Sequence, residues 1–386
     1  MQVSRQLESH LRRRSLWRGL LAPGVMTVMA GLLLAAAAIA VLQWAVISGA
    51  YSVVPVRYLL RDSHDDYLVV SHTVASLKRG PSNGVPVYVL GGSVTNEMIE
   101  TPEGLATQLE ELTGNEVSVY WLASFAQSFG QSLAILDNLP RRPGLVVIAV
   151  SPSRFVYHAD RNEDQVVGKP FLLHSEALFD VVVKGWRRRL PANVWPGIAD
   201  FLATYGGFVF NGLRSGVLPP LEYKRHRYAD GDQLPLASKR ELVRLGVERG
   251  MSAIREHFPD NAPFLERSVA LARQRDYVVV VLEMPRDEQA IGGDWDEGLA
   301  VYQPFCREVA ARYGGVYLDF SQDVGLVSAD FADLFHLVEP GRAKWQRRLA
   351  AELAPWVRMA AAAGGVGERA PAVRRMAGAT GGTGAP

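Results

Sequence analysis

The chain has 386 residues, of which 48% are hydrophobic, enough for one α/β core with a few dozen residues left for accessory segments. Its 41 basic and 40 acidic residues give a net charge of +1, which argues against a nucleic-acid-binding surface and against a strongly acidic substrate. The single cysteine, Cys306, excludes an internal disulfide and leaves the redox compartment open.

The N-terminal region combines a basic segment with a long apolar one. Residues 1–19 contain five arginines, and residues 20–48 carry no charged side chain. The apolar stretch exceeds the roughly 20 residues that a helix needs to cross a bilayer and the apolar core of a typical cleaved signal peptide. We predict a retained signal anchor, with the basic segment in the cytoplasm and the chain from Tyr51 onward outside it. The alternatives are a cleaved signal peptide, which the small residues 48–50 would suit, and a buried core helix.

Five apolar runs rich in Val, Leu and Ile follow a turn-forming segment at residues 79–84. Strands without polar alternation are buried on both faces, as in a parallel sheet covered by helices. Residues 104–112 and 131–139, which lie between the first three runs, have helical spacing. We therefore predict a doubly wound α/β domain over residues 85–360, joined to the anchor by a linker at 49–84, with its ligand at the carboxyl ends of the strands. The runs are Val85–Leu90, Val117–Leu122, Leu145–Val150, Tyr277–Leu282 and Val316–Phe320.

The strand rhythm breaks between about residues 156 and 264. This segment contains several aromatic residues, prolines and glycines, and two basic clusters at 184–189 and 224–227. We predict a largely helical insertion at the carboxyl end of the third strand, which would act as a lid or a docking surface because it exceeds an ordinary connection in length. The basic clusters also fit an ordinary solvated surface. Residues 361–386 are rich in Gly, Ala and Pro and are expected to form a disordered tail.

The first predicted strand runs directly into Gly91-Gly92-Ser93. A strand, a glycine turn and a helix start can bind an anion, can expose a nucleophilic serine, or can form a plain βα turn. A phosphate loop is disfavoured because no lysine follows the glycines. The nucleophile elbow of an α/β-hydrolase is disfavoured because Thr95 stands where that motif needs glycine.

Near the C-terminus, Asp333 and His336 lie three residues apart, just before an amphipathic stretch. In a tight turn such a carboxylate can accept the N–H of one imidazole nitrogen and leave the other nitrogen free as a base. A serine needs a base of this kind to act as a nucleophile at neutral pH. The sequence therefore predicts a catalytic triad of Ser93, His336 and Asp333.

These motifs make the chain similar to the SGNH, or GDSL, hydrolase superfamily over residues 86–353, with the insertion excluded. The family's first block is a strand ending in a Gly-Asp-Ser-like turn, and its last block is Asp-x-x-His. In the second block a glycine donates its backbone N–H to the oxyanion, and Ala126 takes that place here. The third block, Gly-x-Asn-Asp in the family, reads Ser151-Pro152-Ser153-Arg154. The resemblance implies a three-layer, flavodoxin-like sandwich and a set of oxyanion or substrate-binding residues, namely Gly92, Ala126, Ser153 and Arg154.

The anchor and the topology also resemble the branch of this superfamily that works beside acyl-transfer systems on bacterial surface polymers, such as the alginate O-acetylation proteins and the D-alanine transfer protein of teichoic acids. This resemblance implies a serine esterase or O-acyltransferase in the periplasm, attached to the bacterial inner membrane by one helix, without metal or cofactor. Its substrate would be a cell-surface glycan and its partner a multi-spanning membrane acyltransferase. The alternative is a non-catalytic SGNH-like module that binds a glycan or a partner protein, which the missing asparagine favours and the retained triad disfavours.

Two further groups of polar residues invite a functional interpretation. Glu283 closes the fourth predicted strand and either lines the pocket or is an ordinary polar residue at a strand end. A cluster of histidines and aspartates before the first strand lacks a recognised metal-ligand spacing and fits a polar linker. The cluster comprises Asp62, His64, Asp65, Asp66 and His72.

Overall fold

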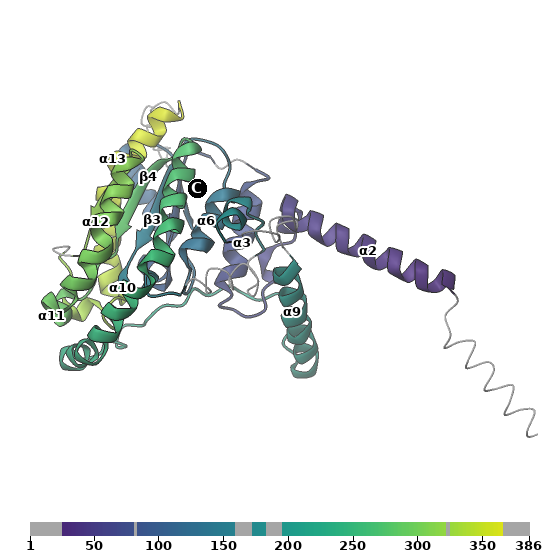
Figure 1. Cartoon of the computed structure of the whole chain (residues 1–386), viewed down its shortest axis with the longest axis horizontal. Coiled ribbons are helices and arrows are strands. Elements are labelled where there is room, and N and C mark those ends of the chain that lie inside the picture. The colour runs from purple at the N-terminus through teal and green to yellow at the C-terminus, as the bar shows by residue number, and fades with distance from the viewer. Residues whose placement is uncertain (1–24, 81–82, 159–171, 183–194, 322–324, 366–386) are drawn as a thin grey trace, which may run out of the picture.

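The computed structural model describes residues 25–80, 83–158, 172–182, 195–321 and 325–365 (Figure 1). Within these residues the protein is an α/β protein with a five-stranded, wholly parallel sheet in the order β2-β1-β3-β4-β5. Each strand begins and ends within one residue of its predicted bounds. The strands are β1 (Val85–Leu90), β2 (Val117–Trp121), β3 (Leu145–Val150), β4 (Val278–Glu283) and β5 (Val316–Asp319).

The three central strands are buried along their whole length, and the two edge strands are only partly covered. Alternate residues of β1 therefore enter two different cores. Val87 and Val89 pack with α5 (Pro102–Thr113) and α13 (Glu339–Ala363). Tyr88 and Leu90 pack on the opposite face with four other helices. Those helices are α3 (Asp66–Leu77), α6 (Phe129–Asn138), α10 (Leu236–Gln274) and α12 (Asp296–Arg312).

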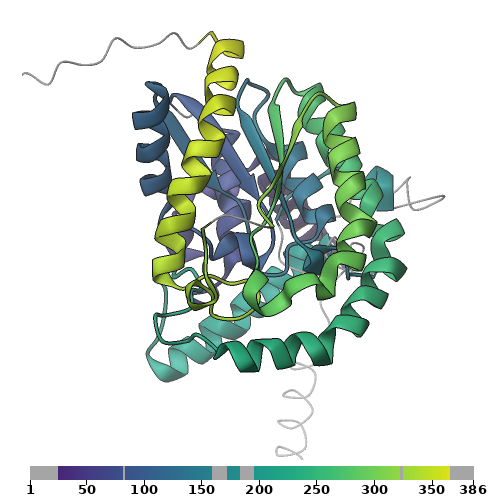
Figure 2. The same cartoon turned by 90° about the vertical axis from the view of Figure 1, so that its left-hand side faces the viewer.

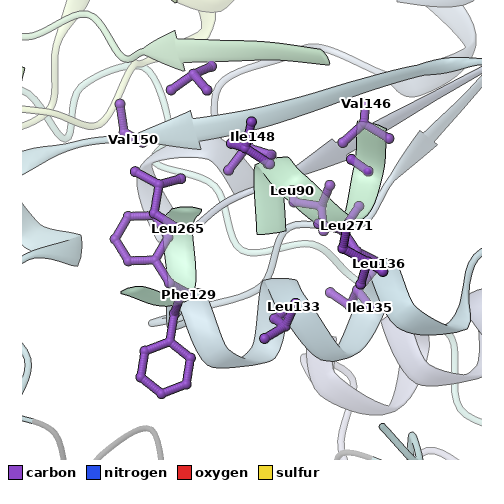
Figure 3. Packing of buried hydrophobic residues seen from close by; sticks show 14 of the residues in the cluster. Leu90, Phe129, Leu133, Ile135, Leu136, Val146, Ile148, Val150, Leu265 and Leu271 are labelled. Atoms are coloured by element: carbon purple, nitrogen blue, oxygen red, sulfur yellow. The ribbon is translucent and has the colours of Figure 1, made fainter. Parts of the chain in front are cut away.

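Helix α6 contributes several side chains to the core that contains Tyr88 and Leu90. Figure 3 shows part of this core, in which Leu133 and Leu136 of α6 belong to one buried cluster with Val146 and Ile148 of β3. Figure 2 shows α13, in yellow, lying across the other side of the sheet. With helices on both faces and the chain turning in opposite directions from β1 and β3, the sheet is doubly wound, and a ligand is expected at the carboxyl edge near β1 and β3.

The remaining helical elements lie between and before these strands and helices in the chain. They are η1 (Ala50–Val53), η2 (Val56–Tyr58), α4 (Ser93–Asn96), η3 (Pro152–Arg154), α8 (Glu176–Val182), α9 (Trp195–Ser215), α11 (Glu288–Ile291), η5 (Gly292–Trp295) and η6 (Ser328–Asp330).

The apolar N-terminal segment forms one long helix, α2 (Val25–Ser48), that extends away from the domain (Figure 1). Among the described residues it is the one helix long and apolar enough to cross a membrane, with a mean hydropathy of 2.2 over Met26–Ser48. Only 6% of it is buried, which disfavours the core-helix alternative and leaves the cleaved signal peptide open. The basic segment at 1–19 lies outside the described residues, as does the start of the predicted anchor.

The segment between α2 and β1, for which we expected a linker, contains α3. Val70, Val74 and Leu77 of this helix are buried in the core next to α6. The side chain of Asp65 caps the helix by accepting the backbone N–H of Leu68 at 3.2 Å. The domain therefore begins before the first strand.

The predicted insertion merges with the helix that leads into β4. The expected boundary near residue 264 lies inside α10, which is continuous from Leu236 to Gln274 although it contains Pro259 and Pro263. A proline in a helix interior costs about 3 kcal/mol, and here the burial of side chains such as Leu265 against the sheet offsets that cost. The basic cluster at 184–189 lies outside the described residues.

At the C-terminus, α13 extends to Ala363, three residues into the stretch expected to form the tail, and residues 366–386 lie outside the described residues.

Candidate active site

The two glycines after β1 have different reasons to be there. A Cβ at Gly91 would lie 2.1 Å from the hydroxyl of Thr95, so this position excludes every larger residue. A Cβ at Gly92 would meet nothing closer than 3.9 Å, and the backbone of this residue is ordinary extended chain. Gly91 thus allows α4 to begin sharply at the strand end, and Ser93 becomes its first residue, half-buried at the carboxyl edge of the sheet.

The structure brings the three predicted triad residues together. The Oγ of Ser93 lies 3.2 Å from Nε2 of His336. The other ring nitrogen, Nδ1, lies 2.8 Å from Oδ2 of Asp333. The serine and the histidine are 243 positions apart in the sequence, so this contact is a product of the tertiary fold.

The spacing of Asp333 and His336 follows from the local turn. While Oδ2 of Asp333 faces the imidazole, Oδ1 accepts the backbone N–H groups of Phe335 and His336, each at 2.8 Å. The backbone N–H of Ala332 donates to the carbonyl of His336 at 2.7 Å and closes the turn. One carboxylate therefore shapes the loop and orients the base.

Buried charged side chains attach the triad loop, residues 328–336, to the rest of the domain. The ammonium of Lys239, a fully buried residue of α10, donates to the carbonyls of Ser328 and Phe331 at 2.6 and 2.8 Å. It also pairs with Asp287 at 3.0 Å, whose backbone N–H donates to the carbonyl of Leu334 at 3.0 Å. Sequence reasoning missed Lys239, because a lysine in a helical pattern ordinarily indicates a solvated face.

His336 and Asp333 shift each other's pKa. Burial by itself would lower the pKa of His336, but the hydrogen bond and charge of Asp333, with a further contribution from the charge of Glu97, raise it above its ordinary value. Burial would raise the pKa of Asp333, yet the bonds from His336 and the two backbone N–H groups lower it below its ordinary value. The site thus favours a carboxylate beside an imidazolium, the state that a proton-accepting base reaches.

The loop after β2 contains a strained alanine. Ala126, which stands where the family pattern has glycine, adopts a left-handed backbone with φ +52°. This conformation costs a non-glycine residue about 1–2 kcal/mol. The position thus keeps the conformation that a glycine would adopt, and the role of its amide as an oxyanion donor stays a prediction.

A buried polar network joins the turns that follow β1, β2 and β3. The side-chain carbonyl of Gln127 accepts the backbone N–H of Gly91 at 3.2 Å and the hydroxyl of Ser132 at 2.9 Å, and its amide donates to the carbonyl of Leu122 at 2.8 Å. Arg154 donates to the same Ser132 hydroxyl at 2.7 Å. Gln127 was not singled out from the sequence, since nothing local distinguishes it from an exposed glutamine.

Arg154 takes part in this network and does not present a donor to the oxyanion. Its guanidinium donates to the carbonyl of Ala149 as well as to Ser132, and its central carbon lies 3.9 Å from the centroid of the Phe129 ring. The residue is 2% exposed. We therefore correct its expected role to support of the strand ends. Ser153, which pairs with the hydroxyl of Ser151 at 3.0 Å, remains a candidate donor of the third block.

Asp66 connects three parts of the site. Its buried carboxylate accepts the amide of Asn96 at 2.9 Å, the backbone N–H of Phe125 at 3.0 Å and the hydroxyl of Tyr223 at 2.6 Å. Burial raises the pKa of Asp66, and the bonds from Tyr223 and Phe125 act in the opposite direction. The sequence placed this residue in a polar linker, whereas the structure places it between the serine helix, the β2 loop and the insertion.

A cavity of about 440 Å³ opens beside the triad histidine. The insertion forms one wall, where the ring of Tyr228 lies 5.4 Å from that of His336 and His226 lies 3.1 Å from the carboxylate of Glu97. Burial raises the pKa of Glu97, and the charges of His336 and His226 oppose that shift. On the other side the cavity is lined by Tyr67, the exposed Phe125 and the residues that precede α3. The site is therefore an open cavity with aromatic and carboxylate walls.

The remaining candidates lie apart from this chemistry. Glu283 is fully buried, bonds to the hydroxyls of Tyr302 and Tyr317 at 2.6 and 3.1 Å, and has its pKa raised by burial to about 8. His64 and His72 each bond to a backbone carbonyl, at 2.6 and 2.7 Å. Among the described residues, no group of three or more His, Cys, Asp or Glu side chains has a geometry suited to a metal ion.

No protein-family model matches the chain, and a search of curated proteins finds no match either.

Proposed function

We propose that the chain is a serine esterase or O-acyltransferase of the SGNH type, which acts outside the cytoplasm on acyl esters of a cell-surface polysaccharide. The observation that carries the proposal is the hydrogen-bonded series from Ser93 through His336 to Asp333 at the carboxyl edge of β1. A serine, an imidazole and a carboxylate in this order make up the unit that activates a hydroxyl nucleophile.

In the first half of the reaction, Nε2 of His336 takes the proton from Ser93 as the serine oxygen bonds to the ester carbonyl carbon. The carbonyl oxygen becomes an oxyanion, for which the backbone amides of Ser93 and Ala126 are the proposed donors. The carbonyl then re-forms and the bond to the sugar oxygen breaks. That oxygen leaves as an alcohol with the proton from His336, and the acyl group remains on Ser93.

In the second half, His336 takes a proton from the incoming hydroxyl, whose oxygen attacks the acyl carbon. Water as the incoming molecule releases a carboxylic acid, and a sugar hydroxyl gives a new ester. Ser93 regains its proton from His336 in both cases. Hydrolysis and transfer thus use the same residues and differ only in the acceptor.

The cavity beside the triad supports a saccharide substrate. Aromatic rings such as Phe125 and Tyr228 offer apolar faces, and carboxylates such as Glu97 provide acceptors for hydroxyl groups. A bilayer-crossing α2 would keep the domain beside the membrane, where the enzymes that assemble surface polymers work. For a transfer reaction, a multi-spanning membrane acyltransferase is the proposed source of the acyl group, and the bacterial inner membrane is the proposed location.

One observation favours a second candidate, a module that binds a glycan or a protein without catalysis. The third block lacks the asparagine of the family, and Arg154 directs its guanidinium to Ala149, Ser132 and Phe129. The oxyanion site therefore has fewer side-chain donors than the family pattern provides.

Hydrolysis of para-nitrophenyl acetate by the full chain in detergent or vesicles separates the two candidates. The proposal predicts turnover that Ser93→Ala abolishes and that Ser238→Ala leaves unchanged, since Ser238 is an exposed serine outside the cavity. Circular dichroism checks that both variants are folded. Equal rates for the two variants and the native chain would contradict the enzyme and leave the binding module.

A further inference from the structure

Helix α9 of the insertion is attached to the domain through its first half. Ile198 is buried in one cluster with Leu60 and Leu68 of the domain, and Phe201 packs against the same cluster. The hydroxyl of Tyr205 donates to the carbonyl of Tyr58 at 2.7 Å. This end of the helix therefore has a fixed position on the domain.

The second half of α9 exposes large apolar side chains. Phe210 and Leu213 leave 70% and 67% of their surface uncovered. The 21 residues of the helix contain two charged side chains, Asp200, which lies 3.7 Å from Arg61 of the domain, and Arg214 near the end. Neighbouring exposed apolar residues enlarge the patch, and we call the set the α9 surface. It comprises Leu202, Phe210 and Leu213 of α9 with Val217 and Leu218, which follow it in the chain.

The α9 surface lies next to the point where α2 leaves the domain. Val46 of α2 and Ile198 of α9 belong to one buried cluster. Figure 1 shows α9 on the face of the domain from which α2 extends, and it shows α9 running across the direction of α2. A bilayer that contains α2 would therefore have its surface along α9.

We propose that α9 is an interfacial helix that lies on the same membrane that α2 crosses, with Phe210 and Leu213 in the boundary between headgroups and acyl chains. A bilayer crossed by α2 would cover the exposed apolar surface of that helix, and the same lipid would cover the α9 surface. The position of Arg214 at the helix end suits contact with lipid phosphates. Two contacts with the bilayer, α2 and α9, give the domain a fixed orientation over the membrane.

The full chain in vesicles of phosphatidylcholine and phosphatidylglycerol provides the test. Single cysteines at Phe210→Cys and Leu213→Cys receive an environment-sensitive fluorophore, while the buried Cys306 stays unlabelled in the folded protein. Leu245→Cys is a matched control, because this leucine is 63% exposed and lies in the first third of α10, a helix that begins on the side of the domain away from α2 (Figure 1). Circular dichroism verifies that each labelled chain is folded.

The proposal predicts blue-shifted emission at positions 210 and 213, protection from aqueous iodide, and stronger quenching by lipids brominated near the headgroup than by lipids brominated near the chain end. The label at 245 should show the reverse, with quenching by iodide and none by brominated lipid. Iodide quenching at 213 equal to that at 245 would overturn the proposal. Strongest quenching by the deepest bromine would overturn it too, because α9 would then span the bilayer. A label open to iodide in pure lipid but shielded in native membranes would assign the α9 surface to a membrane protein instead.

Discussion

The two halves of the candidate site are built in different ways. Ser93 follows a turn that is held by Gln127, a residue only 36 positions from Gly91. Asp333 and His336 depend on a loop whose anchors come from far away in the sequence, above all Lys239, which is 92 positions from Phe331. The nucleophile thus belongs to the sheet, whereas the base is positioned by the insertion and the helix that continues it. The insertion therefore holds the candidate base in place as well as lining the cavity.

The largest effect should come from removing either Ser93 or His336. His336→Ala should lower kcat/KM for para-nitrophenyl acetate by about 10⁴-fold or more, and His336→Ala combined with Ser93→Ala should cost little beyond either change alone, because the members of one catalytic unit are strongly non-additive. Multiplying losses in the double variant would show that the two residues act separately.

Substitution of Lys239 is the most selective test of the distant contacts that hold the triad loop. Lys239→Met leaves Asp287 as a buried charge without its cation, and we expect a loss of about 3–5 kcal/mol in the free energy of unfolding, measured in urea. Activity should fall as well, because the ammonium no longer fixes the triad loop. The neighbouring exposed residue provides the control, and Arg240→Met should stay within about 0.5 kcal/mol of the native chain. A stable, fully active Lys239→Met would refute the dependence of the base on α10.

Substitution of Gln127 tests the network that holds the turn before Ser93. Gln127→Met keeps the side-chain volume but leaves the backbone N–H of Gly91 and the carbonyl of Leu122 without their partner. Each unsatisfied group should lower the free energy of unfolding by about 1–3 kcal/mol. We expect lower stability and a fall in kcat that is smaller than for the triad variants. Gln274→Met, at the exposed last residue of α10, should change neither quantity. An unchanged kcat in a destabilised Gln127→Met would show that the network supports folding without positioning Ser93.

A pH profile tests whether the two halves of the site interact. Glu97 directly follows α4, the helix that begins with Ser93, and its charge raises the pKa of His336. His336 must be neutral to accept a proton, so kcat/KM should rise with pH through the raised pKa of the free enzyme. The negative charge of Glu97 raises that pKa, so Glu97→Gln should move the midpoint to lower pH. Glu100→Gln should leave it in place. A midpoint that stays or moves upward in Glu97→Gln contradicts the assigned electrostatics.

The smallest effect is expected at Ala126. Ala126→Gly should retain activity and raise the free energy of unfolding by at most about 1 kcal/mol, since relief of the left-handed alanine is partly offset by the greater freedom of glycine in the unfolded chain. Ala126→Val should lower both stability and activity, because a β-branched residue tolerates this conformation poorly. Equal behaviour of the two variants in urea unfolding would remove the argument for strain.

The sheet was predictable because its strands are apolar on both faces. A run such as Leu145–Val150 has no polar residue to place in solvent, so its burial and its bounds follow from composition alone. The pair Asp333 and His336 was predictable for a related reason, since one short turn places both groups. Local sequence was sufficient wherever local physics decides the structure.

The rest of the site depends on contacts between distant residues. Asp66 and Gln127 are ordinary polar residues in the sequence, and only the fold gives the side chain of each at least three partners. Arg154 follows a strand end, where a donor to the oxyanion was expected, but its side chain turns inward to Phe129. The continuity of α10 through two prolines likewise depends on packing against the sheet. Sequence alone specifies none of these contacts.

The most direct test of the central claim is the site of covalent labelling. The full chain, treated with an activated phosphonate ester and digested, should carry one phosphonyl group, which peptide mass spectrometry assigns to Ser93. The label should be absent from Ser93→Ala and strongly reduced in His336→Ala, since the nucleophile needs its base. A label on another residue, or equal labelling of Ser93→Ala and the native chain, would contradict the triad.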